Sequence, residues 1–563
     1  MSARRTSILR QGCGRQHGAA LMVMLVILVV GAAAILVSVL SSSSLKIERD
    51  KATADALAKA KDALIAYAVS DVNRPGELPC PDVNDDGMVT VGTDYSGSNC
   101  TSPIGRLPWK TLDLPELRDG NGEHLWYAVT KTFWANGTTT INSDAQGNLN
   151  VSGTTTASNV IAIVFAPGDT LSAQNRSTTQ TASCTTTGTT ITNSLCASNY
   201  LEGSNANLST TSTPNTAFQT AAVSSTFNDQ MIYITHDQLF QPVETRIARE
   251  AKKCLDDYES DSSNTNHRYP WAARDDDSTY TGEYYRIFGR IPTSPLTMTS
   301  NVTLDNTYAL PMLNALSTLQ NALNAYSAGV NATTTSALLS AAQALITAAQ
   351  NADTSGSFAS YSSITGNADN AGDNGRDLAN GVAGVYVSTV QNSINSTNYY
   401  LDNYGFIDGT MPKYWSWPAT CMFNSGYWSN WKQEVFYQLA SAERPGSGYS
   451  TCNTSCLSIT GSGNPNSGSG TYNAAIIVGR AHVASLNPAV PVYSDPASYS
   501  PYKSYYLEGS NKHSSYQNYF SSPQLSQTFV TYRPTDPNYS SVNDLVLCLD
   551  GYNATTNPTA NCK

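Results

Sequence analysis

Acidic and amide side chains alternate in one short segment, in a pattern typical of a calcium loop. Asp82, Asn84 and Asp86 are spaced two residues apart, and Gly87 follows them directly. In the first half of an EF-hand-type loop, alternate side-chain oxygens surround the ion and a glycine permits the tight turn. The twelfth position of such a loop carries a bidentate glutamate, but here it is Thr93. The sequence therefore supports two hypotheses, a calcium site and a plain turn built by Asp and Asn side chains.

No catalytic motif is visible elsewhere in the chain. The histidines beyond residue 18 are scattered, at His124, His236, His267, His482 and His513. The metalloprotease motif HExxH, the hydrolase motif Gly-x-Ser-x-Gly and the phosphate-binding loop do not occur. The tryptophans within 415–417 and 427–431 could bind sugars, and they could equally pack in a hydrophobic core. We therefore expect no enzymatic activity and name no catalytic residue.

An arginine-rich leader precedes an unbroken apolar run from Ala19 to Leu40. The leader has no acidic residue and contains Arg4, Arg5, Arg10 and Arg15. At about 1.5 Å per residue, a helix over the run reaches roughly 33 Å, enough to cross a bilayer core. By the positive-inside rule the leader stays cytoplasmic. The sequence therefore predicts a single-pass transmembrane helix at 19–40, with everything beyond it exported.

The residues around Gly18 carry a resemblance to a known family. Gln16-His17-Gly18, followed by the apolar run that starts at Ala19, resembles the cleavage site of type IV prepilins and type II secretion pseudopilins. The resemblance implies that a prepilin peptidase cuts after Gly18 and methylates Ala19. The fifth mature residue, a glutamate in most of the family, is Val23, as in certain minor pilins and the large tip pseudopilin. A plain uncleaved signal anchor is the alternative.

The helical pattern continues beyond the apolar run. No glycine or proline follows Leu40 before Pro75, and Ala56, Ala60, Ala63 and Tyr67 recur at helical spacing. One stripe of this helix can therefore pack against an exported domain. A helix that leaves the membrane and enters a globular head is the architecture that the pilin resemblance implies.

The cysteines indicate a head held by disulfides. The chain has eleven cysteines, and without Cys13 of the leader ten remain. An even number of cysteines in an exported chain is typical of disulfides, although spacing alone does not fix their pairing. Proximity along the sequence favours four close pairs and leaves Cys254 for Cys421. The close pairs are Cys80 with Cys100, Cys184 with Cys196, Cys452 with Cys456, and Cys548 with Cys562.

The charge of the chain argues against nucleic acid as a partner. Only 13% of the residues are charged, and the formal net charge is −11. Loss of the four leader arginines would take it to −15. Because nucleic-acid binding depends on basic surface, we expect no nucleic-acid partner.

An internal repeat predicts a duplicated head. The hexapeptide Tyr-Leu-Glu-Gly-Ser-Asn occurs at 200–205 and again at 506–511, and a strand-like segment opened by Asn-Asp follows each copy, at Asn228 and Asn543. Gly-Arg-Leu-Pro at 105–108 likewise matches Gly-Arg-Ile-Pro at 289–292. We therefore predict two units, at 41–240 and 241–563. In the hexapeptide we expect a glycine turn with positive φ, with ligand binding by its glutamate as the alternative.

Two helical stripes interrupt the second unit between about 300 and 400. One begins at Met312 and the other at Leu338, and Gly329 separates them. We expect an inserted helical hairpin here. The large tip pseudopilin also carries a helical insertion, so the comparison extends to architecture.

The predicted fold class is α+β. It consists of a transmembrane helix that continues into a pilin-like head of helix plus antiparallel sheet, duplicated and carrying the helical insertion. The resemblance implies a minor pilin or pseudopilin at a filament tip, acting in assembly, adhesion or cargo contact. Its partners would be other pilins through the N-terminal helix, the prepilin peptidase and the membrane. The alternative is a signal-anchored periplasmic hydrolase or carbohydrate-binding protein.

Overall fold

The computed structural model describes most of the chain. In parts of the first, third and sixth helices, including residues 17–21 and 31–43, only the backbone is described. The described residues are 17–135, 137–184, 190–207, 215–261, 269–273, 280, 287–292, 306–355, 362–404, 417–440, 457–463, 472–481, 506–511 and 528–549.

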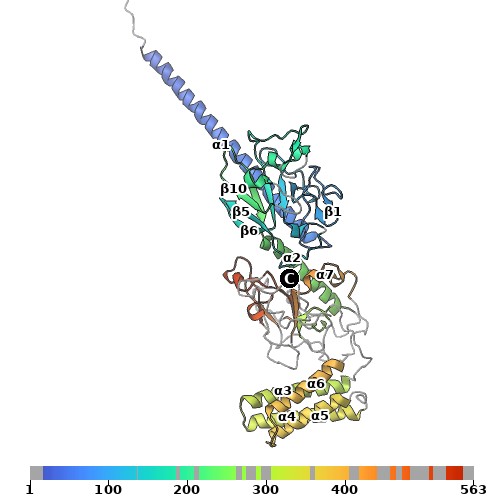
Figure 1. Ribbon diagram of the computed structural model, residues 1–563. Coiled ribbons are helices and arrows are strands. Elements are labelled where there is room, and N and C mark those ends of the chain that lie inside the picture. The colour runs from blue at the N-terminus through green and yellow to red at the C-terminus, as the bar shows by residue number, and fades with distance from the viewer. Residues whose placement is uncertain are drawn as a thin grey trace, which may run out of the picture. The chain divides into compact units, whose positions relative to one another are not determined.

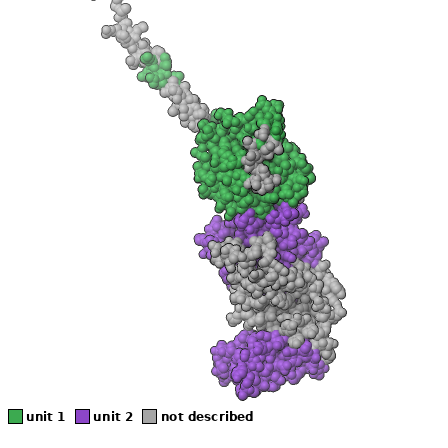
Figure 2. Space-filling model, viewed as in Figure 1, with its two compact units in different colours: residues 1–66, 78–135, 147–235 green, residues 67–77, 136–146, 236–563 purple. Residues whose placement is uncertain are grey.

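The chain forms two compact units (Figure 2). Unit 1 comprises residues 1–66, 78–135 and 147–235, and unit 2 comprises 67–77, 136–146 and 236–563. The sequence placed both short segments, 67–77 and 136–146, in the first unit, whereas the structure assigns them to the second. The contacts of the second long helix, given below, explain this difference.

Helix α1 (His17–Ser70) is a single long helix (Figure 1). Its apolar side chains from Met24 to Val30 are exposed, and its later part is buried in unit 1 along a stripe that includes Leu57, Ala60 and Leu64. A search of the described part of the chain finds no helix that is long and apolar enough to cross a membrane. The side chains of 19–21, 23 and 31–40, more than half of the predicted span, lie outside the described residues.

Unit 1 is built on a four-stranded antiparallel sheet. Its strands are β3 (Ile104–Arg106), β4 (Trp126–Val129), β7 (Ala162–Ala166) and β11 (Gln230–Ile234), in the order β11-β7-β4-β3. Strand β7 is buried along its whole length, as expected for a central strand covered on both faces. Helix α1 contacts this sheet, because Lys61 Nζ donates to the carbonyl oxygen of Tyr233 in β11 over 3.0 Å.

Unit 2 repeats this strand order. Its sheet contains β12 (Phe288–Arg290), β13 (Val435–Leu439), β15 (Ala474–Val478) and β17 (Leu545–Leu549), in the order β12-β13-β15-β17, and all neighbours are antiparallel. The registers also correspond, because the glycine of each Gly-Arg pair lies opposite a tyrosine: Gly105 opposite Tyr127, and Gly289 opposite Tyr437.

Shorter elements surround the two sheets. A parallel pair flanks each sheet: β5 (Leu149–Gly153) with β10 (Ala217–Thr220) in unit 1, and β14 (Ser458–Thr460) with β16 (Thr528–Val530) in unit 2. The remaining strands are β1 (Tyr95–Ser96), β2 (Asn99–Cys100), β6 (Ala157–Val160), β8 (Thr181–Ser183) and β9 (Thr190–Thr192). The short helices are η1 (Lys131–Phe133), η2 (Asn193–Leu195), η3 (Ala197–Asn199), η4 (Gly203–Ala206), η6 (Met422–Asn424), α7 (Trp428–Trp431), η8 (Gly509–Asn511) and η9 (Pro537–Ser540).

Helix α2 (His236–Glu259) packs on β15 and β17 of unit 2. Its predicted stripe, Ile247, Ala251, Cys254 and Tyr258, is buried.

Helix α2 also holds the two short segments that the sequence assigned to the first unit. Arg246 donates to the carbonyl oxygens of Val69 and Asp71, and His236 Nε2 lies 2.7 Å from the carbonyl oxygen of Ser143. These contacts with three backbone carbonyl oxygens tie both segments to α2, in agreement with their place in unit 2.

The insertion is a bundle of four helices rather than the predicted hairpin of two (Figure 1). Its helices are α3 (Asn306–Ala328), α4 (Ala332–Thr354), α5 (Ser362–Ala379) and α6 (Val387–Tyr404). Helix α5 lacks a stripe of large apolar residues, so periodicity does not reveal it. It packs through glycines instead: a Cβ on Gly372 would lie 2.6 Å from Ile346 Cγ1, and one on Gly375 would lie 2.9 Å from Leu319 Cδ1.

Candidate functional site

The predicted processing residues lie at the start of α1. Gly18 and Ala19 fall in the first described turn of the helix, and nothing is described of the side chains at Ala19 or Val23. Cleavage after Gly18 stays a prediction. What the structure adds is the division of α1 into an exposed apolar part and a later part that is buried against a sheet.

The segment predicted as a calcium loop is held by two buried aspartates. Asp82 Oδ1 accepts the backbone N–H of Asn84 and Asp85 over 3.0 and 2.7 Å, and Asp82 Oδ2 accepts that of Gly87 over 2.6 Å. From the other end of the loop, Asp94 accepts the N–H of Val83 and Thr90. Both carboxyl groups thus accept hydrogen bonds from backbone N–H groups that would otherwise be buried without partners.

The other two predicted calcium ligands bond to each other. Asn84 Nδ2 donates to Asp86 Oδ2 over 2.8 Å, and Asp86 Oδ1 accepts the N–H of Met88 over 2.7 Å. Among the described residues, no group of three His, Cys, Asp or Glu side chains is arranged to hold a metal ion. Burial raises the pKa of Asp82 to about 6, against the opposing effect of its three N–H donors. Calcium binding stays a prediction, and the present geometry is that of an Asx-rich turn.

Asp85, a residue that the calcium pattern skips, makes the long-range contacts of this loop. Its backbone is left-handed, with φ of +62°, which turns its side chain toward His124, whose Nδ1 lies 2.7 Å from Asp85 Oδ1. His124 Nε2 in turn lies 2.5 Å from Glu116 Oε1. The hydrogen bond to Asp85 raises the pKa of His124, and the one to Glu116 adds to this effect. No local motif marks this cluster, because its members come from three separate segments.

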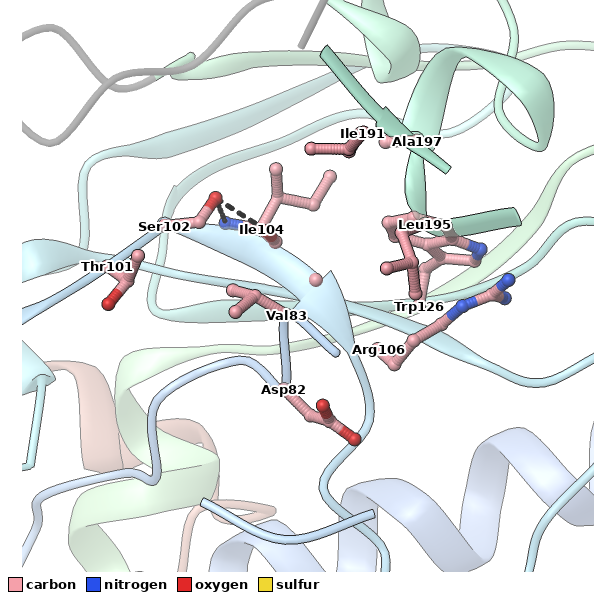
Figure 3. A pocket seen from close by; sticks show the side chains of 11 residues that line it. Asp82, Val83, Thr101, Ser102, Ile104, Arg106, Trp126, Ile191, Leu195 and Ala197 are labelled. Carbon is pink, nitrogen blue, oxygen red and sulfur yellow. Dashed lines mark hydrogen bonds between the residues drawn. The ribbon is translucent and has the colours of Figure 1, made fainter. Parts of the chain in front are cut away.

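A cavity of about 310 Å³ opens between the loop and β3 (Figure 3). Ile104, Trp126, Ile191 and Leu195 form most of its apolar wall, and Asp82 and Arg106 lie along its base in Figure 3. The wall is mostly apolar.

Arg106 is the charged group that joins the cavity to the hexapeptide. Its guanidinium lies 4.2 Å from the ring centre of Trp126 and 4.0 Å from that of Tyr200, and it donates to the carbonyl oxygens of His124 and Ser194. This geometry is that of a cation–π stack. In unit 2, Arg290 similarly lies 3.8 Å from the ring centre of Phe436.

The hexapeptide forms a turn in both units, as predicted. Gly203 has φ of +54° and Gly509 has φ of +53°, which is the left-handed region that favours glycine. The asparagine that ends each copy is fully buried. Asn205 bonds the backbone N–H and carbonyl of Gln219 in β10, and Asn511 bonds those of Val530 in β16.

The described histidines bond polar groups, and the described tryptophans of 415–417 and 427–431 are buried. His124 bonds carboxylates, and His236 bonds Asp237 and a backbone carbonyl. His267, His482, His513 and Trp415 lie outside the described residues. Trp417, Trp428 and Trp431 are buried in the core of unit 2, so they are core residues rather than an exposed sugar platform.

Three disulfides are described, Cys80–Cys100, Cys184–Cys196 and Cys254–Cys421. They are three of the pairings that spacing favoured. Cys548 is also disulfide-bonded. Cys452, Cys456 and Cys562 lie outside the described residues.

Comparison of the chain with protein-family models, with curated proteins and with solved structures finds no match.

Proposed function

We propose that the chain is a large minor pilin or pseudopilin, acting at the tip of a type IV pilus or type II secretion pseudopilus. In this proposal α1 anchors the protein in the inner membrane before assembly, and the two units lie in the periplasm. The helix then packs with other pilins in the filament, and the units act in assembly, adhesion or cargo contact.

The observation that carries the proposal is the division of α1. Met22 and the residues from Met24 to Val30 present apolar side chains to solvent, and Met24 is 76% exposed. Exposed apolar surface costs about 25 cal/mol per Å², so a continuous apolar helix surface requires a cover. A membrane supplies that cover before assembly, and the helices of other subunits supply it afterwards.

The tip position is supported by the size of the exported part and by Val23. A chain of 563 residues with two sheets and a four-helix bundle is too bulky to repeat along a thin filament without collisions. The missing glutamate at residue 23 removes the group that would neutralise the amino terminus of a neighbouring subunit, where an unpaired charge in the membrane is expensive. Both features suit a subunit that occurs once, at the end.

The first test is the mass of the membrane-extracted protein. The expected N-terminus is Ala19, methylated, and replacing Gly18 with leucine should leave the leader attached while the helix still inserts. Gly14→Leu, a change to another leader glycine, is the matched control and should be processed normally. An N-terminus at Met1, or beyond residue 30, would contradict the assignment.

The second test is the position of the subunit in filaments. Antibody against unit 2, viewed by electron microscopy, should label filament ends, and labelling spaced along the filament would exclude a tip role. The alternative, a signal-anchored hydrolase or carbohydrate-binding protein, predicts no filament labelling and hydrolysis or retention on a glycan array.

A further inference from the structure

Each unit buries two carboxyl groups in direct contact with each other. In unit 1 these are Glu202 of the hexapeptide and Asp229, just before β11, and their side chains are hydrogen-bonded. In unit 2 the equivalent residues, Glu508 and Asp544, form the same contact. All four side chains are at least nine-tenths buried, and Asp544 is fully buried. Because the arrangement occurs at matching positions in both units, it is a feature of the repeated fold and not of a single loop.

Backbone and amide donors account for only part of the oxygen atoms in the unit 2 pair. Asp544 Oδ2 accepts the N–H of Glu508 over 3.1 Å and Asn511 Nδ2 over 3.0 Å, and Glu508 Oε2 accepts the N–H of Asn543 over 3.2 Å. The remaining oxygens, Glu508 Oε1 and Asp544 Oδ1, are buried and have no donor among the described groups. One proton held between the two carboxyl groups supplies the missing donor.

The unit 1 pair repeats this pattern with one addition. Asp229 Oδ2 accepts the N–H of Glu202 and Asn205 Nδ2, both over 2.9 Å, and Glu202 Oε2 accepts the N–H of Asn228 and Asp229. Gln174 Nε2 donates to Glu202 Oε1, which leaves Asp229 Oδ1 as the buried oxygen without a donor.

We propose that each carboxyl pair holds one proton at neutral pH and that its loss at alkaline pH releases the hexapeptide, which makes both units sensitive to alkaline conditions. Ionisation of both carboxyl groups would place two adjacent negative charges out of water. The hydrogen bonds most exposed to this repulsion join the hexapeptide to the start of β11 in unit 1 and of β17 in unit 2.

The surroundings of both pairs favour retention of the proton. Burial raises the pKa of Asp229 well above its ordinary value, and the adjacent Glu202 adds to the rise. In unit 2, burial and the adjacent Asp544 raise the pKa of Glu508 to about 10, and burial raises that of Asp544 to about 7.

Among the described residues, the nearby cations are engaged by other groups. Arg480 faces the unit 2 pair, but its Nε lies 2.6 Å from Glu244 Oε2. On the unit 1 side, Arg176 donates to Gln174 and is ion-paired with Glu123 over 3.0 Å.

The sign of the pH effect follows from the two states. An unfolded carboxyl group loses its proton near pH 4, whereas each folded pair keeps one. From about pH 5 up to the folded pKa, the unfolded chain therefore binds fewer protons than the folded chain. The unfolding equilibrium constant then rises about tenfold per pH unit for each proton retained.

The matched substitutions are Asp229→Asn and Asp544→Asn. The amide oxygen can keep the two hydrogen bonds made by Oδ2, and the amide nitrogen takes the place of the donorless Oδ1 and donates to the glutamate. Asp55→Asn, at an exposed position of α1, is the control. The full chain in detergent is used throughout.

Infrared difference spectroscopy reads the proton directly. At pH 8 the wild type should show the C=O stretch of a protonated carboxyl group, and each Asn variant should lose part of that band. The control should retain all of it. A band equal in wild type and both variants, or no band at all, would overturn the proposal. Should the variants misfold, part of the wild-type band must still disappear as pH rises through the folded pKa of each pair.

Urea unfolding between pH 5 and 9 gives the energetic readout. In the wild type, the folding equilibrium constant should fall as pH rises, by up to tenfold per pH unit for each retained proton. In each Asn variant this fall should be less steep, because one pair no longer retains a proton. Unchanged slopes in both variants would contradict the proposal. Stabilisation of the wild type by calcium at pH 8 that the Asp229→Asn and Asp544→Asn variants lose would assign the pairs to a cation and also overturn the proposal.

Discussion

Cys254 of α2 is disulfide-bonded to Cys421, and the loop of chain that this bond closes contains the whole four-helix bundle. The two cysteines are 167 residues apart in sequence, whereas Cys184 and Cys196 are 12 apart. The bond therefore links α2 covalently to the segment that follows the four-helix bundle.

Loss of this disulfide is expected to be more costly than loss of the shorter one. The chain-entropy relation gives about 5 kcal/mol for a loop of this length and about 3 kcal/mol for the Cys184–Cys196 loop. Replacing both cysteines of each pair with alanine and measuring urea unfolding tests the order. Equal losses for the two pairs would show that native-state contacts, rather than loop closure, set their effect.

The left-handed glycines of the hexapeptide give a second prediction. Alanine at Gly203 or Gly509 should destabilise its unit by about 1–2 kcal/mol, because an L-residue is strained at this φ. The Cβ of Gly203→Ala would lie 2.0 Å from Gln219 Nε2, the end of a flexible side chain that can move aside, and that of Gly509→Ala would lie 3.1 Å from Val542 Cγ2. Backbone strain should therefore dominate at both positions, and the two losses should be similar. Thermal unfolding of the two variants measures them, and an unchanged midpoint in either variant would contradict this interpretation of the turn.

Helix α1 is fixed to unit 1 through Thr53. Its buried hydroxyl donates to the carbonyl oxygen of Arg49 over 3.0 Å and accepts the N–H of Gly120 over 2.9 Å. Thr53→Val keeps the shape of the side chain but leaves the N–H of Gly120 without an acceptor. We therefore expect the free energy of unfolding to fall by about 1–3 kcal/mol. Thr53→Ser keeps the hydroxyl and should cost less. Urea unfolding of the two variants makes the comparison, and equal losses would mean that the methyl group, not the hydrogen bonds, fixes the helix.

Calcium binding at the loop is tested by thermal unfolding of the full chain. A ligand that binds only the folded state must raise its apparent stability, so the calcium hypothesis predicts a higher midpoint in millimolar calcium and reversal by chelator. Asp86→Ala should abolish that shift, since Asp86 is the exposed carboxylate among the predicted ligands. An identical midpoint with calcium and with chelator would contradict calcium binding and favour the other hypothesis, an Asx-rich turn held by the Cys80–Cys100 disulfide.

Glu434 gives a pH-dependent prediction in unit 2. This glutamate is fully buried, and burial raises its pKa well above the ordinary value. Because the folded pKa is the higher one, the unfolded chain ionises first, and stability should fall as pH rises above about 4.5. Glu434→Gln keeps an acceptor for the N–H of Ser143, which lies 3.0 Å from Oε2, and should flatten that fall. Urea unfolding at pH 5 and pH 8 checks it, and an unaltered pH dependence would refute it.

Local patterns in the sequence were sufficient to predict several features of the fold. The repeated hexapeptide predicted a glycine turn, and the positive φ of Gly203 and Gly509 agrees with it, because a turn is specified by the few residues that form it. Helical periodicity likewise predicted the buried stripe of α2, since each helical residue contacts neighbours three and four places away. Spacing also favoured the three disulfides that are described.

Tertiary structure decided what depends on residues far apart. The sequence predicted a hairpin where a four-helix bundle stands, because α5 packs through Gly372 and Gly375, whose role is visible only against Ile346 and Leu319. It identified Asp82 but not its partnership with Asp94, nor the contact of Asp85 with His124. It read the hexapeptide glutamates as turn residues, and only the fold brings Glu202 and Glu508 against buried aspartates. Periodicity and motifs record local geometry, whereas burial and charge pairing arise when distant segments exclude water together.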